Sequence, residues 1–351
     1  MKGVKKVEEI HGGNIYKYPN VLDFSANINP FGPPEGVLKR MHHTMQKIEQ
    51  YPDDTCARLR EKLGQFLGVS PDSLICGNGA ADLIYRLAWA IRPKHAMVLS
   101  PCFSEYEKAL NMLHTKVEHF WLPKENFLLP DTFLERITES LDFIVLCNPN
   151  NPTGQLIPPE QMKHIVEKCE KMHVFLLIDE CFLPFLEEEK RYSFLNDTKV
   201  HDNIFVLRAF TKMYAVPGLR LGYGVCSNAS VLERMQNAGP PWNVSTLAQE
   251  AGEAALFEQS YVKKTIAYLN EEKAYLYKEL EKLPLLFWYG AANYIFMKGP
   301  EDLQKRLLDK GILIRDCSNY INLEKGYYRI AVRTHKENQI LLEQLKNILI
   351  R

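Results

Sequence analysis

Short apolar runs alternate with amphipathic stretches over the first two thirds of the chain. The apolar runs are rich in Val, Ile, Leu and Phe and predict strands at residues 74–76, 96–100, 117–121, 143–147, 175–178, 204–207 and 221–226. One amphipathic stretch, residues 158–172, begins with two prolines, which fit the first turn of a helix. This alternation predicts an α/β fold with a mainly parallel seven-stranded sheet and helices on both faces.

The pattern changes at Gly239-Pro-Pro-Trp242, and the residues that follow are rich in Ala, Glu, Lys and Leu, which favour helices. A smaller α/β domain comes last, with helices at 301–310 and at the C-terminal end and strands at 293–297, 312–315 and 327–332. We therefore expect four parts: an N-terminal arm that joins the small domain (1–35), a large domain (36–245), linking helices (246–282) and a small C-terminal domain (283–351).

Composition narrows the class of protein. The chain has 351 residues, of which 46% are hydrophobic, enough for a sizeable core. Its 43 Lys and Arg balance its 43 Asp and Glu, so no overall charge favours nucleic acid or an anionic membrane. The N-terminal sequence lacks the apolar core of a signal peptide, and no apolar run could span a bilayer. We expect a cytoplasmic protein whose ligands are small molecules.

Cysteine and histidine spacing gives no sign of a metal site. The eight cysteines are scattered without a Cys-x-x-Cys pair, and they are expected to be reduced thiols in the core. His42 and His43 are adjacent, so on a helix they would point apart, and no His-Glu-x-x-His arrangement occurs. We therefore predict no bound metal.

Three motifs follow predicted strands. Gly77-Asn-Gly79-Ala80-Ala-Asp82 opens a helix, whose free amides favour an anion, although a plain tight turn explains the sequence equally well. Residues 148–154, Asn-Pro-Asn-Asn-Pro-Thr-Gly, form an irregular loop where open α/β sheets bind ligands. Asp179 ends an apolar strand and would need a cation if it is buried; a helix N-cap is its alternative role.

A fourth segment, residues 208–223, reads Arg-Ala-Phe-Thr-Lys-Met-Tyr-Ala-Val-Pro-Gly-Leu-Arg-Leu-Gly-Tyr. Together with residues 148–154 and Asp179, in this order and spacing, it resembles the aspartate-aminotransferase fold family of pyridoxal-phosphate enzymes, which includes the class I and II aminotransferases. The resemblance extends over nearly the whole chain. It implies that pyridoxal 5'-phosphate is the cofactor and that Lys212 carries it as a Schiff base.

The resemblance also assigns contacts to the cofactor. Lys212 is the catalytic residue, since its amine can move protons at the substrate carbons. Asp179 is expected to pair with the pyridine nitrogen, which keeps the ring able to accept electrons. Arg220, with the amides of Gly79 and Ala80, is expected to hold the phosphate.

Further contacts concern the cofactor ring and a second subunit. Asn151 is expected to bond the phenolic oxygen and Phe103 to stack on the ring. Tyr51, in Tyr51-Pro-Asp, resembles the tyrosine that many relatives reach across a dimer interface to the phosphate, which implies a homodimer.

Two positions depart from the family pattern. Phe182 stands where many aminotransferases have a tyrosine, so one hydrogen bond to the phenolic oxygen is missing. Ala209 stands where a phosphate-binding hydroxyl is common, and the neighbouring Thr211 is expected to substitute.

Within the family the chain resembles the threonine-phosphate decarboxylases. The similar segments are His11-Gly12-Gly-Asn14 and residues 23–30, 212–223, 312–320 and 327–333. The first segment separates the decarboxylases from histidinol-phosphate aminotransferases; its alternative interpretation is a disordered tail. The resemblance implies decarboxylation of L-threonine O-3-phosphate to (R)-1-amino-2-propanol O-2-phosphate in cobalamin biosynthesis.

A substrate of this kind carries two anionic groups. Arg315 and Arg329 would supply fork-shaped donors from adjacent strands, and His11, Gly12 and Asn27 would close the pocket from the N-terminal arm. Asn151 is expected to face the substrate as well as the cofactor. Structural salt bridges are the alternative role for both arginines, and they are the favoured one for a third, Arg333, which is not assigned to the site.

Two other functions stay open on sequence grounds. A histidinol-phosphate aminotransferase, or a related one, would use the same cofactor residues. A non-enzymatic pyridoxal-phosphate-binding regulator is disfavoured, because there is no DNA-binding extension and Lys212, Asp179 and Arg220 are all present. Serine phosphate also stays open as a substrate, because one methyl group discriminates by only about 1–3 kcal/mol.

Overall fold

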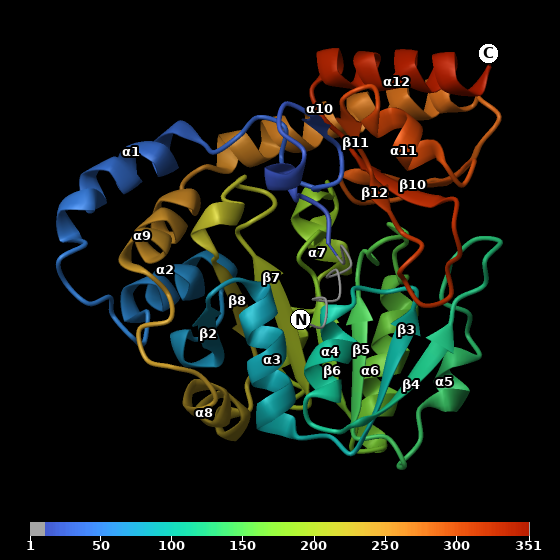
Figure 1. The fold of residues 1–351 in the computed structure, drawn as a ribbon. Coiled ribbons are helices and arrows are strands. Elements are labelled where there is room, and N and C mark those ends of the chain that lie inside the picture. The colour runs from blue at the N-terminus through green and yellow to red at the C-terminus, as the bar shows by residue number, and fades with distance from the viewer. Residues whose placement is uncertain (1–10, 351) are drawn as a thin grey trace, which may run out of the picture.

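A seven-stranded sheet forms the centre of the computed structural model, which describes residues 11–350 (Figure 1). Its strands, in spatial order, are β2 (Leu74–Gly77), β8 (Gly222–Val225), β7 (Ile204–Ala209), β6 (Phe175–Asp179), β5 (Phe143–Cys147), β3 (His95–Ser100) and β4 (Lys116–Trp121). All neighbouring strands are parallel except β8, which runs antiparallel to both β2 and β7. The structure thus confirms the predicted α/β fold and each of its sheet strands.

The central strands are buried on both faces. Successive residues of β5 belong to two different cores: Val145 and Cys147 lie in one, and Ile144 and Leu146 in the other. This is why these strands read as continuous apolar runs. One core is covered by α3 (Ala80–Ile91), α4 (Glu105–Asn111) and α8 (Ala229–Asn237). The other is covered by α2 (Ala57–Leu67) and α6 (Pro159–Lys171), and it continues into the C-terminal region.

The C-terminal region contains an antiparallel sheet, seen in orange and red in Figure 1. Its strands, in order, are β12 (Arg315–Asp316), β13 (Tyr327–Ala331), β10 (Tyr294–Lys298) and β9 (Leu286–Trp288). Helices α11 (Leu303–Leu308) and α12 (His335–Leu349) accompany it, and a capping box between Thr334 and Glu337 begins α12.

The predicted strand at 312–315 is wrong as a single element. Its first part, β11 (Ile312–Leu313), pairs in parallel with β1 (Leu22–Asp23), whereas β12 pairs with β13. The chain therefore changes its partner strand at Ile314. The first partner, β1, belongs to the N-terminal segment, and the local sequence around residues 312–315 could not reveal it. The short strand β9 was not predicted either. The division into four parts stays a prediction.

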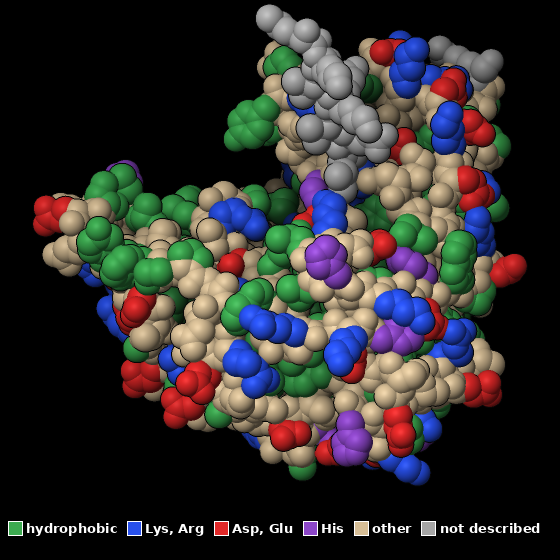
Figure 2. All heavy atoms as spheres, turned by 60° about the horizontal axis from the view of Figure 1, so that its bottom comes forward, with side chains coloured by type: hydrophobic (Ala, Val, Ile, Leu, Met, Phe, Trp, Pro, Cys, Tyr) green, Lys and Arg blue, Asp and Glu red, His purple; other side chains and the backbone are tan. Residues whose placement is uncertain are grey.

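Helices connect the two sheets. α9 (Thr246–Ala255) packs on α1 (Glu35–Thr44), and α10 (Gln259–Leu280) leads toward the C-terminal sheet. α1 projects from the body of the molecule, and Figure 2 shows hydrophobic side chains along this projection. The remaining helices are short: α5 (Phe133–Arg136), α7 (Glu189–Tyr192) and the 3-10 helices Ile15–Lys17, Met45–Lys47, Pro71–Ser73, Leu183–Phe185, Asp197–Lys199 and Pro217–Leu219.

Over residues 11–350, no helix is long and apolar enough to cross a membrane. In the same range, no three or more His, Cys, Asp and Glu side chains are grouped as metal ligands would be. The eight cysteines carry free thiols, and all but Cys102 are buried.

Candidate active site

A cavity of about 400 Å³ lies at the carboxyl ends of β5, β6 and β7, where Cys147, Asp179 and Ala209 reach its wall. This is the edge at which open α/β sheets bind ligands. The antiparallel sheet and the N-terminal segment supply the opposite wall. The cavity brings together most of the residues that the sequence nominated, namely His11, Gly12, Asn27, Ala80, Phe103, Asn151, Asp179, Thr211, Lys212, Arg220, Arg315 and Arg329.

Asp179 is buried at the end of β6 and held by two donors. The Tyr106 hydroxyl donates to Oδ2 at 2.7 Å, and the Cys181 backbone N–H donates to Oδ1 at 2.9 Å. Burial, reinforced by the charge of Asp179, raises the pKa of Tyr106, so this hydroxyl stays protonated as a donor. The carboxylate is thereby fixed against the cavity, where it can pair with a cationic nitrogen.

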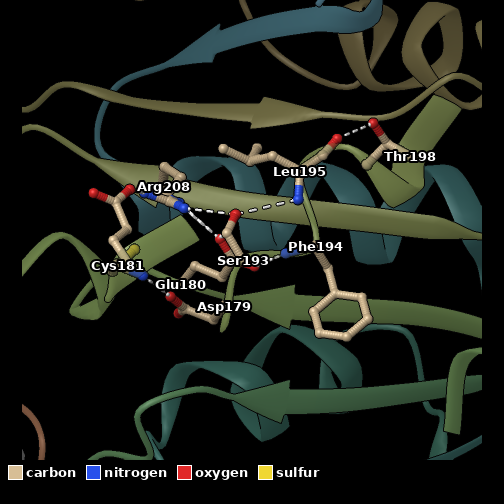
Figure 3. Close-up of polar contacts among 9 residues, drawn as sticks. Asp179, Glu180, Cys181, Ser193, Phe194, Leu195, Thr198 and Arg208 are labelled. Atoms are coloured by element: carbon tan, nitrogen blue, oxygen red, sulfur yellow. Dashed lines mark hydrogen bonds and ion pairs between the residues drawn. The ribbon is translucent and has the colours of Figure 1, made fainter. Parts of the chain in front are cut away.

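A buried ion pair lies directly behind Asp179 (Figure 3). Arg208 of β7 is 2% exposed and Glu180 is 0% exposed. Arg208 Nε and Nη2 donate to Glu180 Oε2 at 2.9 and 2.6 Å, and Nη2 also donates to Ser193 Oγ. Arg208 Nη1 contacts Glu189. The pair ties the end of β6 to the end of β7, which carry Asp179 and the segment leading to Lys212.

Lys212 lies in the loop after β7, with its amine in the cavity. Burial lowers its pKa to about 8, and the positive charges of Arg329 and Arg220 act in the same direction. A lysine of this kind is partly neutral near physiological pH, so its amine can serve as a nucleophile and as a proton carrier. Its Nζ lies 5.8 Å from the centre of the Phe182 ring.

The ring of Phe182 packs edge-on against Tyr294, with centroids 5.1 Å apart. Tyr294 in turn donates from its hydroxyl to the Asn150 carbonyl at 2.8 Å. Position 182, where many aminotransferases have a tyrosine, is therefore filled by an apolar ring that offers the cavity no hydrogen-bond donor.

An anion cradle forms where α3 begins. Gly79 has φ +84°, and a Cβ at this position would lie 2.5 Å from Arg220 Nη2. A Cβ on Gly222 would lie 2.5 Å from the backbone nitrogen of Ala80. Because both positions lack a Cβ, the Arg220 guanidinium and the N-terminus of α3 can lie close together, where both can bind one anion. Thr211 lines the same cavity. A plain tight turn accounts for the φ of Gly79 but not for the arginine beside it.

Arg315 and Arg329 are directly opposite each other on β12 and β13. Arg329 is buried, and its Nη2 donates to the Ser25 carbonyl at 2.9 Å while its Nη1 contacts Asn151 Oδ1. Arg315 Nη2 donates to Asn319 Oδ1 at 2.8 Å. Within residues 11–350, Arg329 forms no salt bridge, so that alternative does not explain it.

Arg333, by contrast, pairs with Glu337 at 2.9 Å on the first turn of α12. This contact fits the structural salt bridge expected for Arg333.

Asn27 has the clearest unmet hydrogen bonding of the nominated residues. It is 2% exposed, and among the described residues neither its Nδ2 nor its Oδ1 has a hydrogen-bond partner. Leaving both polar atoms unpaired costs free energy, so the cavity is suited to a ligand that bonds them.

Tyr51 does not line the cavity. It is 80% exposed and stacks on Trp242, with ring centroids 4.5 Å apart. Gly79 also lies behind the cavity wall rather than on it, where it makes room for Arg220. A contact between Tyr51 and a cofactor would need a second copy of the chain, and that assignment stays a prediction.

Several polar contacts of the site were missed. Ser25 lies in the N-terminal segment 23–30, whose similarity to the family was noted without a role for Ser25, and Tyr106 lies three residues after Phe103. The Glu180–Arg208 pair could have been suspected because Arg208 lies within the apolar strand β7 and Glu180 directly follows the apolar strand β6. Their partners, however, are distant along the chain and only folding reveals them.

The residues present fit pyridoxal phosphate. Three groups of the cavity match three parts of this cofactor. They are an amine of lowered pKa, a carboxylate held by two donors, and an arginine beside a helix N-terminus. Lys212, Asp179 and Arg220 would hold the aldehyde carbon, the pyridine nitrogen and the phosphate. Phe103, on the cavity wall, offers an aromatic ring for stacking.

Comparison with known proteins agrees with this geometry. The chain is 39% identical to the threonine-phosphate decarboxylase of Salmonella typhimurium, over 97% of this chain and 96% of the relative. It is 30% identical to the histidinol-phosphate aminotransferase of Methanosphaera stadtmanae, over 94% of this chain and 90% of the relative. The crystal structure of the histidinol-phosphate aminotransferase from Clostridium acetobutylicum superposes with a TM-score of 0.88 at 28% identity, covering 93% of this chain and 99% of its own.

The sequence pattern of the family "Aminotransferase class I and II" matches residues 19–345, from the N-terminal segment into α12. This match, the cavity residues and the full-length relatives lead to one assignment: the chain belongs to the class I and II aminotransferase family, and pyridoxal 5'-phosphate is its cofactor.

Proposed function

We propose that this enzyme decarboxylates L-threonine O-3-phosphate to (R)-1-amino-2-propanol O-2-phosphate in cobalamin biosynthesis. The observation that carries the proposal is the pair Arg315 and Arg329, which are buried, directly opposite on adjacent strands and on the cavity wall. Two guanidinium groups on the wall of one cavity suit a doubly charged anion such as a phosphate ester. The 39% identity to a threonine-phosphate decarboxylase supports this choice.

The placement of the substrate phosphate decides which bond can break. Guanidinium groups bind phosphate through two parallel hydrogen bonds, and His11 and Asn27 line the same wall. If Arg329 holds the substrate phosphate, it does not hold the substrate carboxylate, which is then free to depart as carbon dioxide. When bound, pyridoxal phosphate would supply an electron sink for the bond that breaks at the substrate α-carbon.

Lys212 completes the reaction. The α-carbon that has lost carbon dioxide must take up one proton, and the Lys212 amine lies in the cavity with a pKa of about 8, close to neutral. Asp179, fixed by Tyr106, would face the pyridine nitrogen with its carboxylate. No step consumes a 2-oxo acid, which distinguishes this reaction from transamination.

Histidinol-phosphate transamination is the second candidate, because relatives of that name match the chain over nearly its full length. In that reaction Arg329 would bind the substrate carboxylate, and the bond to the α-hydrogen would be the one that breaks.

We expect the purified holoenzyme to release carbon dioxide from L-threonine O-3-phosphate with no 2-oxo acid added. Carbon dioxide release and product phosphate ester are measured in parallel, with L-serine O-phosphate as a comparison substrate. The proposal is wrong if histidinol phosphate with 2-oxoglutarate gives a much higher kcat/KM than any carbon dioxide release. Arg329 would then be a carboxylate clamp.

We also expect a homodimer. Tyr51 is exposed and stacks on Trp242, and the apolar side chains of Leu38 on α1, of Met45 and Ile48 just after it, and of Trp242 are exposed as well. Apolar surface of this extent favours association with another chain. Sedimentation velocity at assay concentrations should give a dimer. A fully active monomer would remove Tyr51 from the site.

A further inference from the structure

His11, at the cavity wall, belongs to a small cluster of polar side chains to which no contact with the cofactor has been assigned. His11 Nε2 lies 2.8 Å from Glu105 Oε1, on the first turn of α4. Glu105 Oε2 accepts a hydrogen bond from the Tyr85 hydroxyl at 2.8 Å, and Lys108 Nζ lies 2.5 Å from Glu105 Oε1. His11 and Glu105 both line the cavity.

The backbone beside His11 is held independently. The Gly13 N–H donates to Ser25 Oγ at 2.8 Å, and Ser25 Oγ donates to Asp23 Oδ1 at 2.6 Å. A Cβ on Gly12 would collide with the Ser25 carbonyl, so the segment lies against Ser25. The same carbonyl accepts the hydrogen bond from Arg329. Backbone contacts thus place residues 11–13 beside Arg329, and the His11 ring needs its own anchor.

We propose that Glu105 is a positioning residue for substrate: it fixes the His11 ring at the end of the cavity that takes the phosphate group. The inference rests on the proposed function, since it assigns the anion at this end to the substrate. Glu105 occupies Nε2, so only Nδ1 is left to donate to an anion. Nδ1 carries a proton together with Nε2 only when the ring is positively charged. The Glu105 carboxylate favours that charged form.

The charges facing His11 show why such a residue is needed. Burial lowers the pKa of His11, and the positive charges of Lys108 and Arg315 lower it further, whereas Glu105 raises it. Glu105 is the acidic group that opposes these effects in the cluster, with the Tyr85 hydroxyl as its second donor. Loss of its charge would leave His11 neutral over more of the working pH range.

The test compares Glu105→Gln with Glu107→Gln in the holoenzyme. Both variants remove one negative charge from α4, but Glu107 faces His119, at 3.4 Å, rather than His11. We expect Glu105→Gln to raise the KM for L-threonine O-3-phosphate and the inhibition constant of inorganic phosphate about three- to tenfold, the range of a partly exposed charged contact. Cofactor affinity and absorbance should not change. Glu107→Gln should match the wild type in every measurement.

The pH profile gives a readout that a structural role would not move. As pH rises through the pKa of His11, kcat/KM loses the contribution of the charged ring, and this loss should begin at lower pH in Glu105→Gln. NMR titration of His11, identified with a His11→Asn variant, should show the same downward shift without any substrate. If wild-type enzyme turns over the substrate but Glu105→Gln leaves KM, phosphate inhibition and the His11 titration unchanged, the inference is wrong. If wild-type enzyme does not act on the substrate, the proposed function fails instead, and the NMR titration still decides the contact between Glu105 and His11.

Discussion

Replacing Lys212 by Ala should reduce carbon dioxide release by about 10³-fold or more, because the change removes both the covalent link to the cofactor and the proton carrier at the α-carbon. Among residues 11–350, Lys212 is the lysine that lines the cavity, and its pKa of about 8 leaves a useful fraction of neutral amine at neutral pH. Borohydride treatment of the yellow wild-type holoenzyme, followed by peptide mapping, should place the cofactor on Lys212. The variant should give no labelled peptide.

Lys273 provides a matched control. Burial also lowers its pKa to about 8, but it lies on α10 and its Nζ donates to the Ala291 carbonyl at 3.0 Å, away from the cavity wall. A lowered pKa alone would make both lysines reactive. We therefore expect Lys273→Met to keep the colour, the label on Lys212 and the activity. Borohydride label on a lysine other than Lys212 would remove the basis for the whole site.

The fold was readable from the sequence because its central strands are buried on both faces. Continuous apolar runs such as residues 143–147 and 204–207 predicted the sheet and the mainly parallel direction of its strands. Residues 312–315 show what apolar runs cannot predict, namely the partner of each strand. Ile312, Leu313 and Ile314 are apolar and Arg315 extends the run, yet β1 pairs with its first part and β13 with its last residue. The local sequence does not mark this division, because β1 belongs to the N-terminal segment.

The motifs that contain Asp179, Lys212 and Arg220 predicted one site, and all three residues line one cavity, while their contacts with the cofactor stay a prediction. The contacts that fix these groups were not predicted. Tyr106 holds Asp179 across 73 residues and Glu105 meets His11 across 94, and neither distance leaves a periodic signal. Tyr51 shows a further limit, because a residue that acts across a subunit interface has no partner within its own chain to identify it.

The Glu180–Arg208 pair connects fold and site. Asp179 and Glu180 are consecutive residues, and Glu180 accepts from the Phe194 N–H at 2.7 Å as well as from Arg208. Burial raises the pKa of Glu180, and Arg208 opposes that effect. The ion pair thus keeps two charges buried in the layer behind the cavity, at the level where β6 and β7 end.

Replacing Arg208 by Met should lower the free energy of unfolding by about 3–5 kcal/mol, because it leaves the Glu180 carboxylate buried without its cation. Urea unfolding of the cofactor-free chain, at one fixed protein concentration, measures this loss. The matched control is Arg333→Met, whose partly exposed pair with Glu337 should contribute no more than about 1 kcal/mol. Combining Arg208→Met with Glu180→Gln removes both charges and should restore part of the loss. Because the pair lies behind Asp179, cofactor affinity should fall in Arg208→Met and recover in the double variant. Equal destabilisation by Arg208→Met and Arg333→Met would show that the buried pair does not hold β6 and β7 together.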